Sequence, residues 1–360
     1  FLLMILFILP LFSGGGAERV ALNLLAELHN RGHLVGIIVF DRVGPLLSMV
    51  PSNVPIYNLN TGSLKNSVAP LVRKIRQLSP KVVFSTFGYI NVALLAIGWL
   101  LPAKTKIWVR EANLPSISLN NNRYPKLTPL LYRLLYRYAD KVICTSKIMK
   151  NEFVSDFSVP EGSIEILPNP VDIDFIRSSM LPIRRFDNGG ICYIASGRLT
   201  FQKGFDRLLK WFSILDDKKS TLVILGGGDD KHALIQQSNE LNLQNRVKFV
   251  GFCDNPWQWY AGADCFLLSS RWEGMPNSVL EALACGTSVI ATEESGGIKE
   301  IVEKSKNNSI IVAINPQQFI HYMKKLKIKN RAFRSNSLLP EKYRKENVIS
   351  IVERWINELK

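Results

Sequence analysis

The feature that most constrains the fold is a repeated unit in which a short apolar run ends in small or polar residues and leads into a helical pattern. The first unit runs from Met4–Pro10 through Ser13–Gly16 into a helix expected over about residues 17–31. Strands that alternate with helices predict a parallel sheet covered by helices on both faces. The other strands expected in the first half are Leu34–Phe40, Val82–Ser85, Ile107–Arg110 and Lys141–Thr145.

The same pattern begins again after Pro182, and 360 residues are too many for one ordinary core. Leu167–Asp172 contains two prolines and is typical of a crossover between domains. We therefore predict two Rossmann-like, doubly wound α/β domains facing each other across a cleft. The first covers residues 1–168 and the second residues 169–339, and an amphipathic helix over about residues 340–360 packs back on the first. The strands expected in the second domain are Gly190–Ala195, Ser220–Leu225, Val247–Val250, Cys265–Ser269, Ser288–Thr292 and Ser309–Val312.

The charge of the chain constrains its partners. The formal net charge is +15, and a hydrophobic content of 47% is typical of a globular protein. Fifteen Lys and Arg residues fall between Lys65 and Lys150, against only Glu111 and Asp140. A solvated basic face is one interpretation. Because acids are nearly absent from this segment, we favour a surface for anionic lipid or a phosphate-bearing ligand, and expect no nucleic acid.

The cysteines and histidines predict neither disulfides nor a metal site. The five cysteines are odd in number, widely spaced and mostly within apolar runs, as expected for reduced core residues of a cytoplasmic protein. The four histidines lack metal-ligand spacing. The apolar first 12 residues lack a basic region and a cleavage site and are too short to span a bilayer. We therefore expect no signal peptide and no transmembrane helix.

A glycine loop, Ser13–Arg19, follows the first predicted strand. Its backbone N–H groups, at a helix N-terminus, can reach an anion, although a tight turn would use the same glycines. Gly14 and Gly16 begin a dinucleotide fingerprint, but Arg19 occupies its third glycine position. This difference disfavours an oxidoreductase.

Two cations precede a predicted helix in the second half. Arg198 and Lys203 are five residues apart in the loop after the first strand of that domain. An Arg fork and a Lys point charge placed in this way can clamp a diphosphate. Chance cations on a solvated loop are the alternative.

The stretch Ser269–Ala282 carries two carboxylates eight residues apart. Glu273 lies in a loop after a strand, and Glu281 lies one turn into the next helix. The N-terminus of that helix favours a phosphate, and the loop backbone of Gly274–Asn277 is free to meet sugar hydroxyls. Glu281 can accept two hydrogen bonds from a ribose diol. Alternatively, Glu281 is a helix-start carboxylate and Glu273 a surface acid.

Together these motifs resemble the retaining glycosyltransferases that have the GT-B fold and a Glu-x7-Glu motif, often called family four. Glu273 and Glu281 match that motif, and Gly197–Gly204 matches the family's diphosphate-binding loop. Gly15–Arg19 resembles its N-terminal loop. Shorter matches are Val250–Phe252, Ala263–Asp264 and Ala284–Thr287.

The resemblance implies a role for each residue. Arg198 and Lys203 would bind the nucleotide diphosphate and stabilise it as it leaves, so that no metal ion or other cofactor is required. Glu281 would hold the ribose, and Glu273 the donor sugar. The remaining donor-binding residues would be Gly274, Met275, Pro276 and Asn277 at the sugar, Gly251, Phe252 and Cys253 at the base, and Gly15 and Gly16 approaching the phosphate or acceptor from the first domain.

The chain departs from the family in one respect. Many members carry a histidine in the N-terminal domain facing the donor sugar, whereas residues 34–231 contain none. At the corresponding strand end, Glu111 or Asn113 is the candidate for positioning and for the acceptor proton, unless Glu111 is the ion-pair partner of Arg110. Two other functions stay open: a non-catalytic, degenerate transferase serving as a membrane-associated subunit, and a sugar epimerase of the same fold.

The function expected from the resemblance is transfer of a hexose or N-acetylhexosamine from a nucleotide-diphosphate sugar, with UDP as the expected carrier, to a lipid-linked surface glycan. The basic segment adds an expected peripheral location on the cytoplasmic face of the cell membrane. Within it, Arg123–Lys126 precedes Leu130–Tyr138, which as a helix would present leucines and tyrosines with Arg133 and Arg137 one turn apart. Such side chains suit an anionic membrane interface, although an ordinary domain helix with solvated arginines is the alternative.

Overall fold

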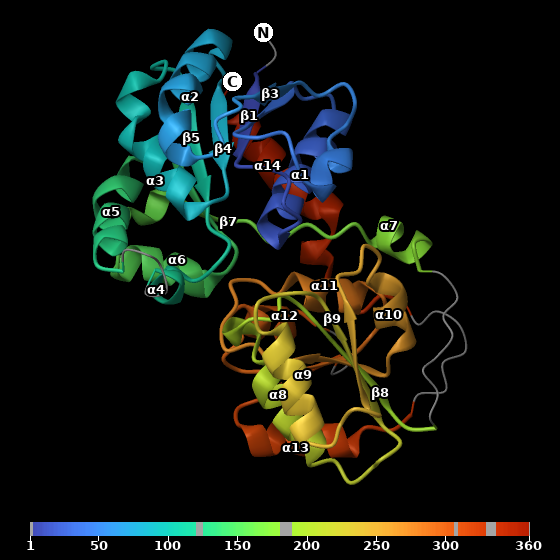
Figure 1. The fold of residues 1–360 in the computed structure, drawn as a ribbon. Helices are drawn as coiled ribbons and strands as arrows, with labels where there is room; N and C mark the ends of the chain where they lie inside the picture. The colour runs from blue at the N-terminus through green and yellow to red at the C-terminus, as the bar shows by residue number, and fades with distance from the viewer. Residues whose placement is uncertain (1–2, 120–124, 181–188, 306–308, 329–335, 360) are drawn as a thin grey trace. The chain divides into compact units, whose positions relative to one another are not determined.

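A computed structural model describes residues 3–119, 125–180, 189–305, 309–328 and 336–359 (Figure 1). The chain forms two compact units. Unit 1 consists of residues 1–170 together with 348–360, and unit 2 consists of residues 171–347. Each unit is built around a parallel sheet, which confirms the predicted fold class of two doubly wound α/β domains.

Unit 1 contains a seven-stranded sheet with the order β3-β2-β1-β4-β5-β6-β7. The central strand β1 pairs with both β2 and β4, so that Ile5 lies opposite Val35 and Val82. Every residue of β1 is buried, as expected for a strand covered on both faces. The strands are β1 (Ile5–Leu9), β2 (Val35–Val39), β3 (Ile56–Asn58), β4 (Val82–Ser85), β5 (Lys106–Arg110), β6 (Lys141–Cys144) and β7 (Ile164–Ile166).

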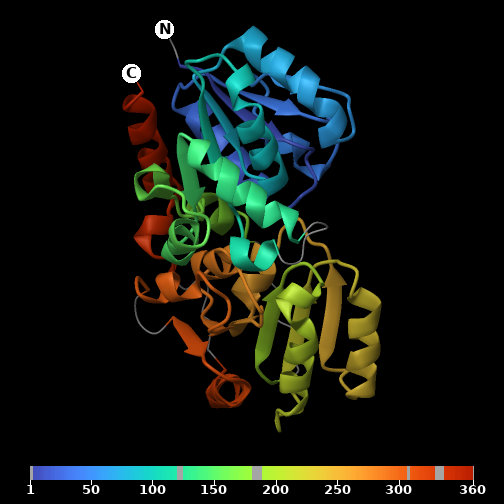
Figure 2. The same ribbon diagram turned by 90° about the vertical axis from the view of Figure 1, so that its left-hand side faces the viewer.

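Helices cover both faces of this sheet (Figure 2). They are α1 (Gly16–Asn30), α2 (Leu64–Leu78), α3 (Gly88–Ala96), α4 (Pro115–Ser118), α5 (Leu127–Leu135), α6 (Lys147–Ser155) and α14 (Lys345–Asn357), with 3₁₀ turns η1 (Pro45–Met49), η2 (Gly98–Leu100), η3 (Tyr136–Tyr138) and η4 (Glu161–Ser163). Alternate strand residues point to opposite faces. Phe7 and Trp108 therefore join one core with α1 and α14, whereas Ile8 and Val109 join another with α2, α3, α5 and α6.

The C-terminal helix α14 packs on unit 1. Trp355 lies edge-on against Trp108, with ring centroids 5.8 Å apart, and Glu353 accepts from Arg31 at 2.7 Å. The helix is shorter than the expected 340–360, because a 3₁₀ turn η6 (Glu341–Tyr343) and an extended Arg344 precede it. The unit boundaries lie at 170/171 and 347/348, whereas the boundaries predicted from the sequence are 168/169 and 339/340.

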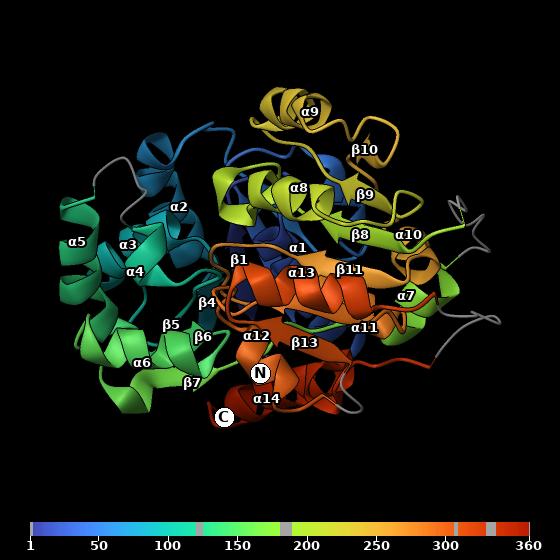
Figure 3. The same ribbon diagram turned by 90° about the horizontal axis from the view of Figure 1, so that it is seen from below.

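Unit 2 contains a six-stranded parallel sheet with the order β10-β9-β8-β11-β12-β13. Its strands are β8 (Cys192–Ser196), β9 (Thr221–Leu225), β10 (Val247–Gly251), β11 (Cys265–Leu268), β12 (Val289–Thr292) and β13 (Ile310–Ala313). Its helices are α7 (Ile173–Ser178), α8 (Phe205–Ser213), α9 (Lys231–Glu240), α10 (Trp257–Gly262), α11 (Asn277–Ala284), α12 (Ile298–Val302) and α13 (Pro316–Lys325), with the 3₁₀ turn η5 (Phe201–Lys203). One core joins the sheet to α8, α9 and α13, and another joins it to α7, α10, α11 and α12 (Figure 3).

Two further expectations from the sequence concern the state of the cysteines and the presence of membrane-spanning helices. Cys144, Cys192, Cys265 and Cys285 are buried free thiols, and Cys253 is half-buried. Within the described ranges, none of the helices combines the length and the apolar character that crossing a bilayer requires.

Candidate functional site

The candidate site of unit 2 lies at the carboxyl edge of its sheet. The strand order reverses between β8 and β11, because β9 and β10 extend the sheet on one side and β12 and β13 on the other. Open parallel sheets bind ligands at such a switch point. The loop after β8 carries Arg198 and Lys203, and the loop after β11 carries Glu273. The predicted residues therefore occupy the two loops that flank the switch point.

Lys203 and Glu273 form an ion pair, with 2.5 Å between Nζ and Oε1. Their side chains are only 17% and 6% exposed. Ser270 Oγ donates to the same carboxylate oxygen at 2.6 Å. The aliphatic part of Lys203 passes over Gly197, where an added Cβ would lie 3.2 Å from Lys203 Cδ. The structure thus brings a predicted diphosphate-binding residue into contact with a predicted donor-sugar residue.

Arg198 differs from Lys203 because its side chain is exposed and has no hydrogen bond or ion pair to any residue that the structure describes. Its neighbour Leu199 is buried and held by the loop after β9: Leu199 N donates to Gly227 O at 2.9 Å, and Asp230 N donates to Leu199 O at 3.0 Å. The backbone at Arg198 is therefore fixed while the guanidinium stays available to an anion.

Two glycines permit the close approach of these loops. Gly226 has φ +131°, and an added Cβ would lie 1.9 Å from the oxygen of Gly197. Gly204 has φ +65°, and its Cβ would lie 2.1 Å from the oxygen of Ser269. Any side chain at either position would force the loops apart. Gly226 was not among the predicted site residues, although three glycines directly after a predicted strand are the signal that points to it.

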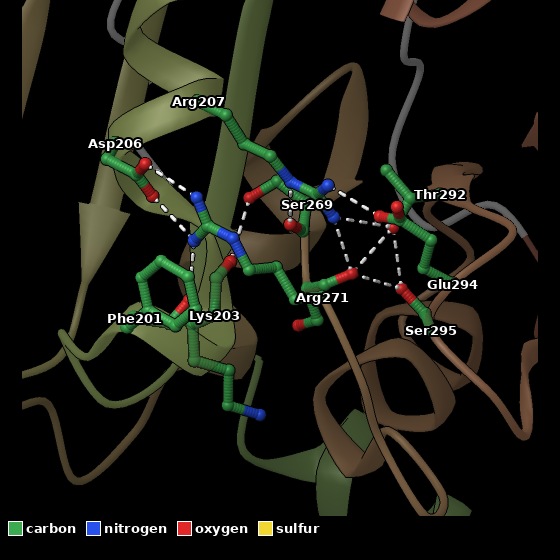
Figure 4. Close-up of polar contacts among 10 residues, drawn as sticks. Phe201, Lys203, Asp206, Arg207, Ser269, Arg271, Thr292, Glu294 and Ser295 are labelled. Carbon is green, nitrogen blue, oxygen red and sulfur yellow. Dashed lines mark hydrogen bonds and ion pairs between the residues drawn. The ribbon is translucent and has the colours of Figure 1, made fainter. Parts of the chain in front are cut away.

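Arg271 clamps the loop that carries Glu273 to the start of α8 (Figure 4). Its guanidinium donates to both carboxylate oxygens of Asp206, at 2.8 and 2.7 Å, and lies 3.8 Å from the ring centroid of Phe201. Partial burial acts to raise the pKa of Asp206, but the hydrogen bonds and the charge of Arg271 outweigh it, so the pKa is lowered. A bidentate pair of this kind fixes orientation as well as distance.

Arg207, the next residue of α8, binds the other side of the same loop (Figure 4). It donates to the backbone oxygens of Ser269 and Ser270 at 2.8 Å each, and to Glu294 at 2.5 Å. Thr292 Oγ1 also donates to the oxygen of Ser270, at 2.8 Å. Sequence reasoning missed both arginines, because the carboxylate and the backbone oxygens that they bind lie more than 60 residues away in the chain.

The helix α11 begins directly after Gly274–Pro276, which are buried, and its N-terminus has no side-chain cap. Its first N–H groups are therefore suited to an anion or to sugar oxygens. Glu281 lies one turn further on, half-buried, and accepts from the indole N–H of Trp257 at 3.2 Å. Among the predicted residues at the base, Gly251 ends β10 and its carbonyl oxygen accepts from Gly226 N at 2.7 Å, Phe252 is 62% exposed, and Cys253 is half-buried.

The glycine loop of unit 1 lies at that unit's own switch point, because the strand order reverses between β1 and β4. Gly15 precedes α1, and Gly16 is its first residue. Glu18 is 5% exposed and accepts from the Ser13 hydroxyl. Because a carboxylate already lies at this helix N-terminus, the loop suits a hydroxyl-bearing ligand better than a phosphate.

Glu111 follows β5 and is buried in unit 1 beneath α5. Its Oε1 accepts from Asn91 Nδ2 at 2.7 Å, from the Tyr132 hydroxyl at 3.2 Å and from the Tyr136 hydroxyl. Burial raises the pKa of Glu111, while these hydrogen bonds act in the opposite direction. Three donors on one carboxylate oxygen make Glu111 an anchor for α5. Asn113, the other candidate for this position, is half-buried.

Arg110 is not the ion-pair partner of Glu111 that one interpretation of the sequence proposed. Its guanidinium points to the opposite side of the strand end and donates to Thr86 at 2.9 Å and to Asn169 at 2.5 Å. Burial lowers the pKa of Arg110 to about 10. Neighbouring residues in a strand face opposite sides of the sheet, which is the physical reason that the two charges do not pair.

Two family models match the chain. The model described as "Glycosyl transferases group 1" matches residues 180–342, and the model described as "Glycosyltransferase Family 4" matches residues 14–175. A curated relative, the N-acetylgalactosamine-N,N'-diacetylbacillosaminyl-diphospho-undecaprenol 4-alpha-N-acetylgalactosaminyltransferase of Campylobacter jejuni, is 30% identical over 305 residues, which is 80% of each chain. An uncharacterized glycosyltransferase of Methanocaldococcus jannaschii is 33% identical over 246 residues, 64% of this chain and 60% of the relative.

Solved structures support the fold. HepE of Anabaena in complex with UDP-glucose superposes with a TM-score of 0.81 at 18% identity, covering 99% of this chain and 100% of HepE. WaaG, a glycosyltransferase involved in lipopolysaccharide biosynthesis, gives a TM-score of 0.70 at 15% identity, covering 97% of this chain and 95% of WaaG. Both likenesses extend over nearly the whole chain.

The hydrogen bonds of Glu111 predict different outcomes for two substitutions. Glu111→Gln keeps an oxygen acceptor for the tyrosines and should change the free energy of unfolding by less than about 1 kcal/mol. Glu111→Leu leaves three buried donors without an acceptor and should lower the free energy of unfolding by about 3 kcal/mol or more. Urea unfolding measures both, with Glu161→Gln, an exposed acid, as the control. If Glu111 handled a proton, the stable Gln variant would lose roughly 10²–10⁴-fold in turnover. Turnover near that of the wild type supports the anchor.

Proposed function

Because the chain belongs to the family 4 glycosyltransferases with the GT-B fold, we propose that it moves a hexose or N-acetylhexosamine from a nucleotide-diphosphate sugar to a growing surface glycan. The anomeric configuration of the donor is retained. The acceptor is carried on a lipid, and the protein works on the cytoplasmic face of an anionic membrane.

The observation that carries the proposal is the charge arrangement at the switch point of unit 2. Lys203 is held by Glu273 in a largely buried pair, while Arg198 beside it is exposed and has no ion pair with any described residue. Negative charge grows on the diphosphate as the glycosidic bond to the donor breaks. The fixed cation Lys203, the available guanidinium of Arg198 and the uncapped N-terminus of α11 favour that redistribution, so protein groups supply what a metal ion would otherwise supply.

The proposed roles of the other donor-site residues follow from their positions in unit 2. Glu281 binds the ribose, because it lies one turn into α11 beside Trp257. Phe252 offers an exposed ring to the base. UDP is the proposed carrier, and the likeness to HepE, solved with UDP-glucose, supports this choice.

A lipid-linked acceptor is supported by relatives and by charge. The printed name of the Campylobacter relative describes a diphospho-undecaprenol substrate, and two other relatives are named for amylovoran and O-antigen biosynthesis. The segment from Lys65 to Lys150 carries the excess of positive charge that an anionic membrane would attract.

A transfer assay tests the proposal directly. Purified protein, a panel of UDP-, GDP- and ADP-sugars and an undecaprenyl-diphosphate glycan should yield product with a UDP-sugar, with turnover unchanged by EDTA. NMR of the product should show the anomeric configuration of the donor. An inverted product would exclude the retaining mechanism, and a product made only from a GDP- or ADP-sugar would exclude UDP as the carrier.

The exposed guanidinium of Arg198 predicts a selective loss of diphosphate binding. Arg198→Ala should weaken UDP by roughly ten- to a hundred-fold and leave uridine nearly unchanged, because a hydrogen bond to a charged group contributes about 1.5–3 kcal/mol. Lys203→Ala also leaves the buried Glu273 carboxylate without its partner. The effect of Lys203→Ala on UDP and uridine binding is therefore measured in a protein that already carries Glu273→Gln. Calorimetry measures both ligands, and Lys210→Ala, an exposed lysine on α8, is the control. An equal loss for UDP and uridine would contradict a diphosphate clamp.

The two carboxylates predict opposite kinetic signatures. Glu273→Gln should leave the fold intact and mainly lower kcat, because Glu273 lies at the proposed sugar position and organises Lys203. Glu281→Gln should mainly raise KM for the donor, because its proposed partner is the ribose. Steady-state kinetics at saturating acceptor separate the two effects, and the reverse pattern would exchange the assigned roles.

A further inference from the structure

The helix α5 carries a stripe of exposed apolar side chains. Leu127, Leu130 and Leu134 are each 51% exposed, and Tyr138 in the following turn η3 is 68% exposed. Leucines spaced by three and four residues lie on one side of a helix. We call these four residues the leucine face. In unit 1, α5 lies on the outside next to α3 (Figure 1 and Figure 3).

The opposite side of α5 and of the turn η3 that follows it is fixed in the core. Tyr132 and Tyr136 are 3% and 0% exposed, their rings stack with centroids 4.2 Å apart, and both hydroxyls donate to the buried Glu111. Rotating the helix to bury its leucines would break these hydrogen bonds and leave the Glu111 carboxylate poorly satisfied. The leucines are therefore held outside by the packing of the tyrosines.

The leucine face lies among the cations of a segment that carries few acids of its own. Lys126, Arg133 and Arg137 of the same segment are exposed. Arg133 donates to the backbone oxygen of Asp156, an exposed acid at the end of α6, at 2.8 Å. Of the two acids between residues 65 and 150, Glu111 is buried and Asp140 pairs with Lys106 at 2.8 Å. Arg123 and Tyr124, which the sequence also placed at this surface, lie outside the described residues.

We propose that the leucine face inserts into the boundary between head groups and acyl chains of an anionic bilayer, with Lys126 and Arg137 contacting lipid phosphates. An amphipathic helix with basic flanks binds in this way through buried apolar area plus attraction to anionic lipid. Three half-exposed leucines and one tyrosine offer far less area than the roughly 800 Å² per partner of a stable protein interface. The inference rests on the proposed function in that it names the surface that meets the membrane.

The test is co-sedimentation with vesicles of phosphatidylglycerol and phosphatidylcholine. The wild type should bind, binding should fall as salt rises, and pure phosphatidylcholine should bind poorly. Leu130→Asp with Leu134→Asp should weaken binding at least about tenfold, as should Lys126→Glu with Arg137→Glu at low salt. Leu130→Gln with Leu134→Gln is a milder second variant. The matched controls in unit 2 are Ile214→Asp, which is 54% exposed, and Lys210→Glu; both should bind like the wild type.

Three results would overturn the inference: vesicle binding that survives the leucine changes, equal binding to neutral vesicles, or a concentration-dependent dimer that the leucine variants abolish while vesicles are ignored. A UDP-induced thermal shift, which should be unchanged in every variant, shows that unit 2 remains folded and competent. Transfer to a water-soluble acceptor is measured on the same preparations. Transfer without vesicle binding rejects the membrane surface alone, and vesicle binding without transfer rejects the proposed function alone.

Discussion

The ion pair between Lys203 and Glu273 is the interaction on which the candidate site depends. The two residues are 70 positions apart, and they meet because β8 and β11 are neighbours in a sheet whose strand order reverses between them. A pair with side chains 17% and 6% exposed is costly to break on one side, since the remaining charge stays in a poorly solvated place. In the proposed function, an incoming diphosphate would therefore meet a lysine that is already oriented.

The loop that carries Glu273 is held rigidly, whereas the side chain of Arg198 near the same pair is not. Arg271 and Arg207 hold the loop of Glu273 from both sides, through a bidentate carboxylate and two backbone oxygens. Arg198 has no such restraint within the described part of the chain. Electrostatic stabilisation requires donors that do not have to reorganise when charge develops, whereas capturing a ligand from solvent benefits from a cation that can reach it. The loop after β8 provides both kinds of cation within six residues of sequence.

The site was predictable where its signals are local. Glu273, Glu281, Arg198 and Lys203 follow predicted strands, and parallel topology alone brings such loops to one edge. The strand Val82–Ser85 has the predicted bounds, but β3 and β7 were missed because each has three mostly half-buried residues with little periodicity. The partners of Glu111 were not predictable. Asn91, Tyr132 and Tyr136 lie 20 or more residues away, and only tertiary packing chooses them over the adjacent Arg110.

The same buried carboxylate explains why Tyr132 and Tyr136 are buried while Leu127, Leu130 and Leu134 are exposed, the reverse of what hydrophobicity alone would favour. A carboxylate in the core is tolerated only when donors satisfy it, and on this helix only tyrosine combines a long apolar ring with a terminal hydroxyl. Placing Tyr132 and Tyr136 inward one turn apart puts Leu127, Leu130 and Leu134 outward, because side chains on a 3.6-residue period cannot all share one face. Exposing these leucines costs free energy that the proposed contact with a membrane would recover. The hydrogen bonds of Glu111 inside unit 1 therefore help to determine which apolar side chains this part of its surface presents.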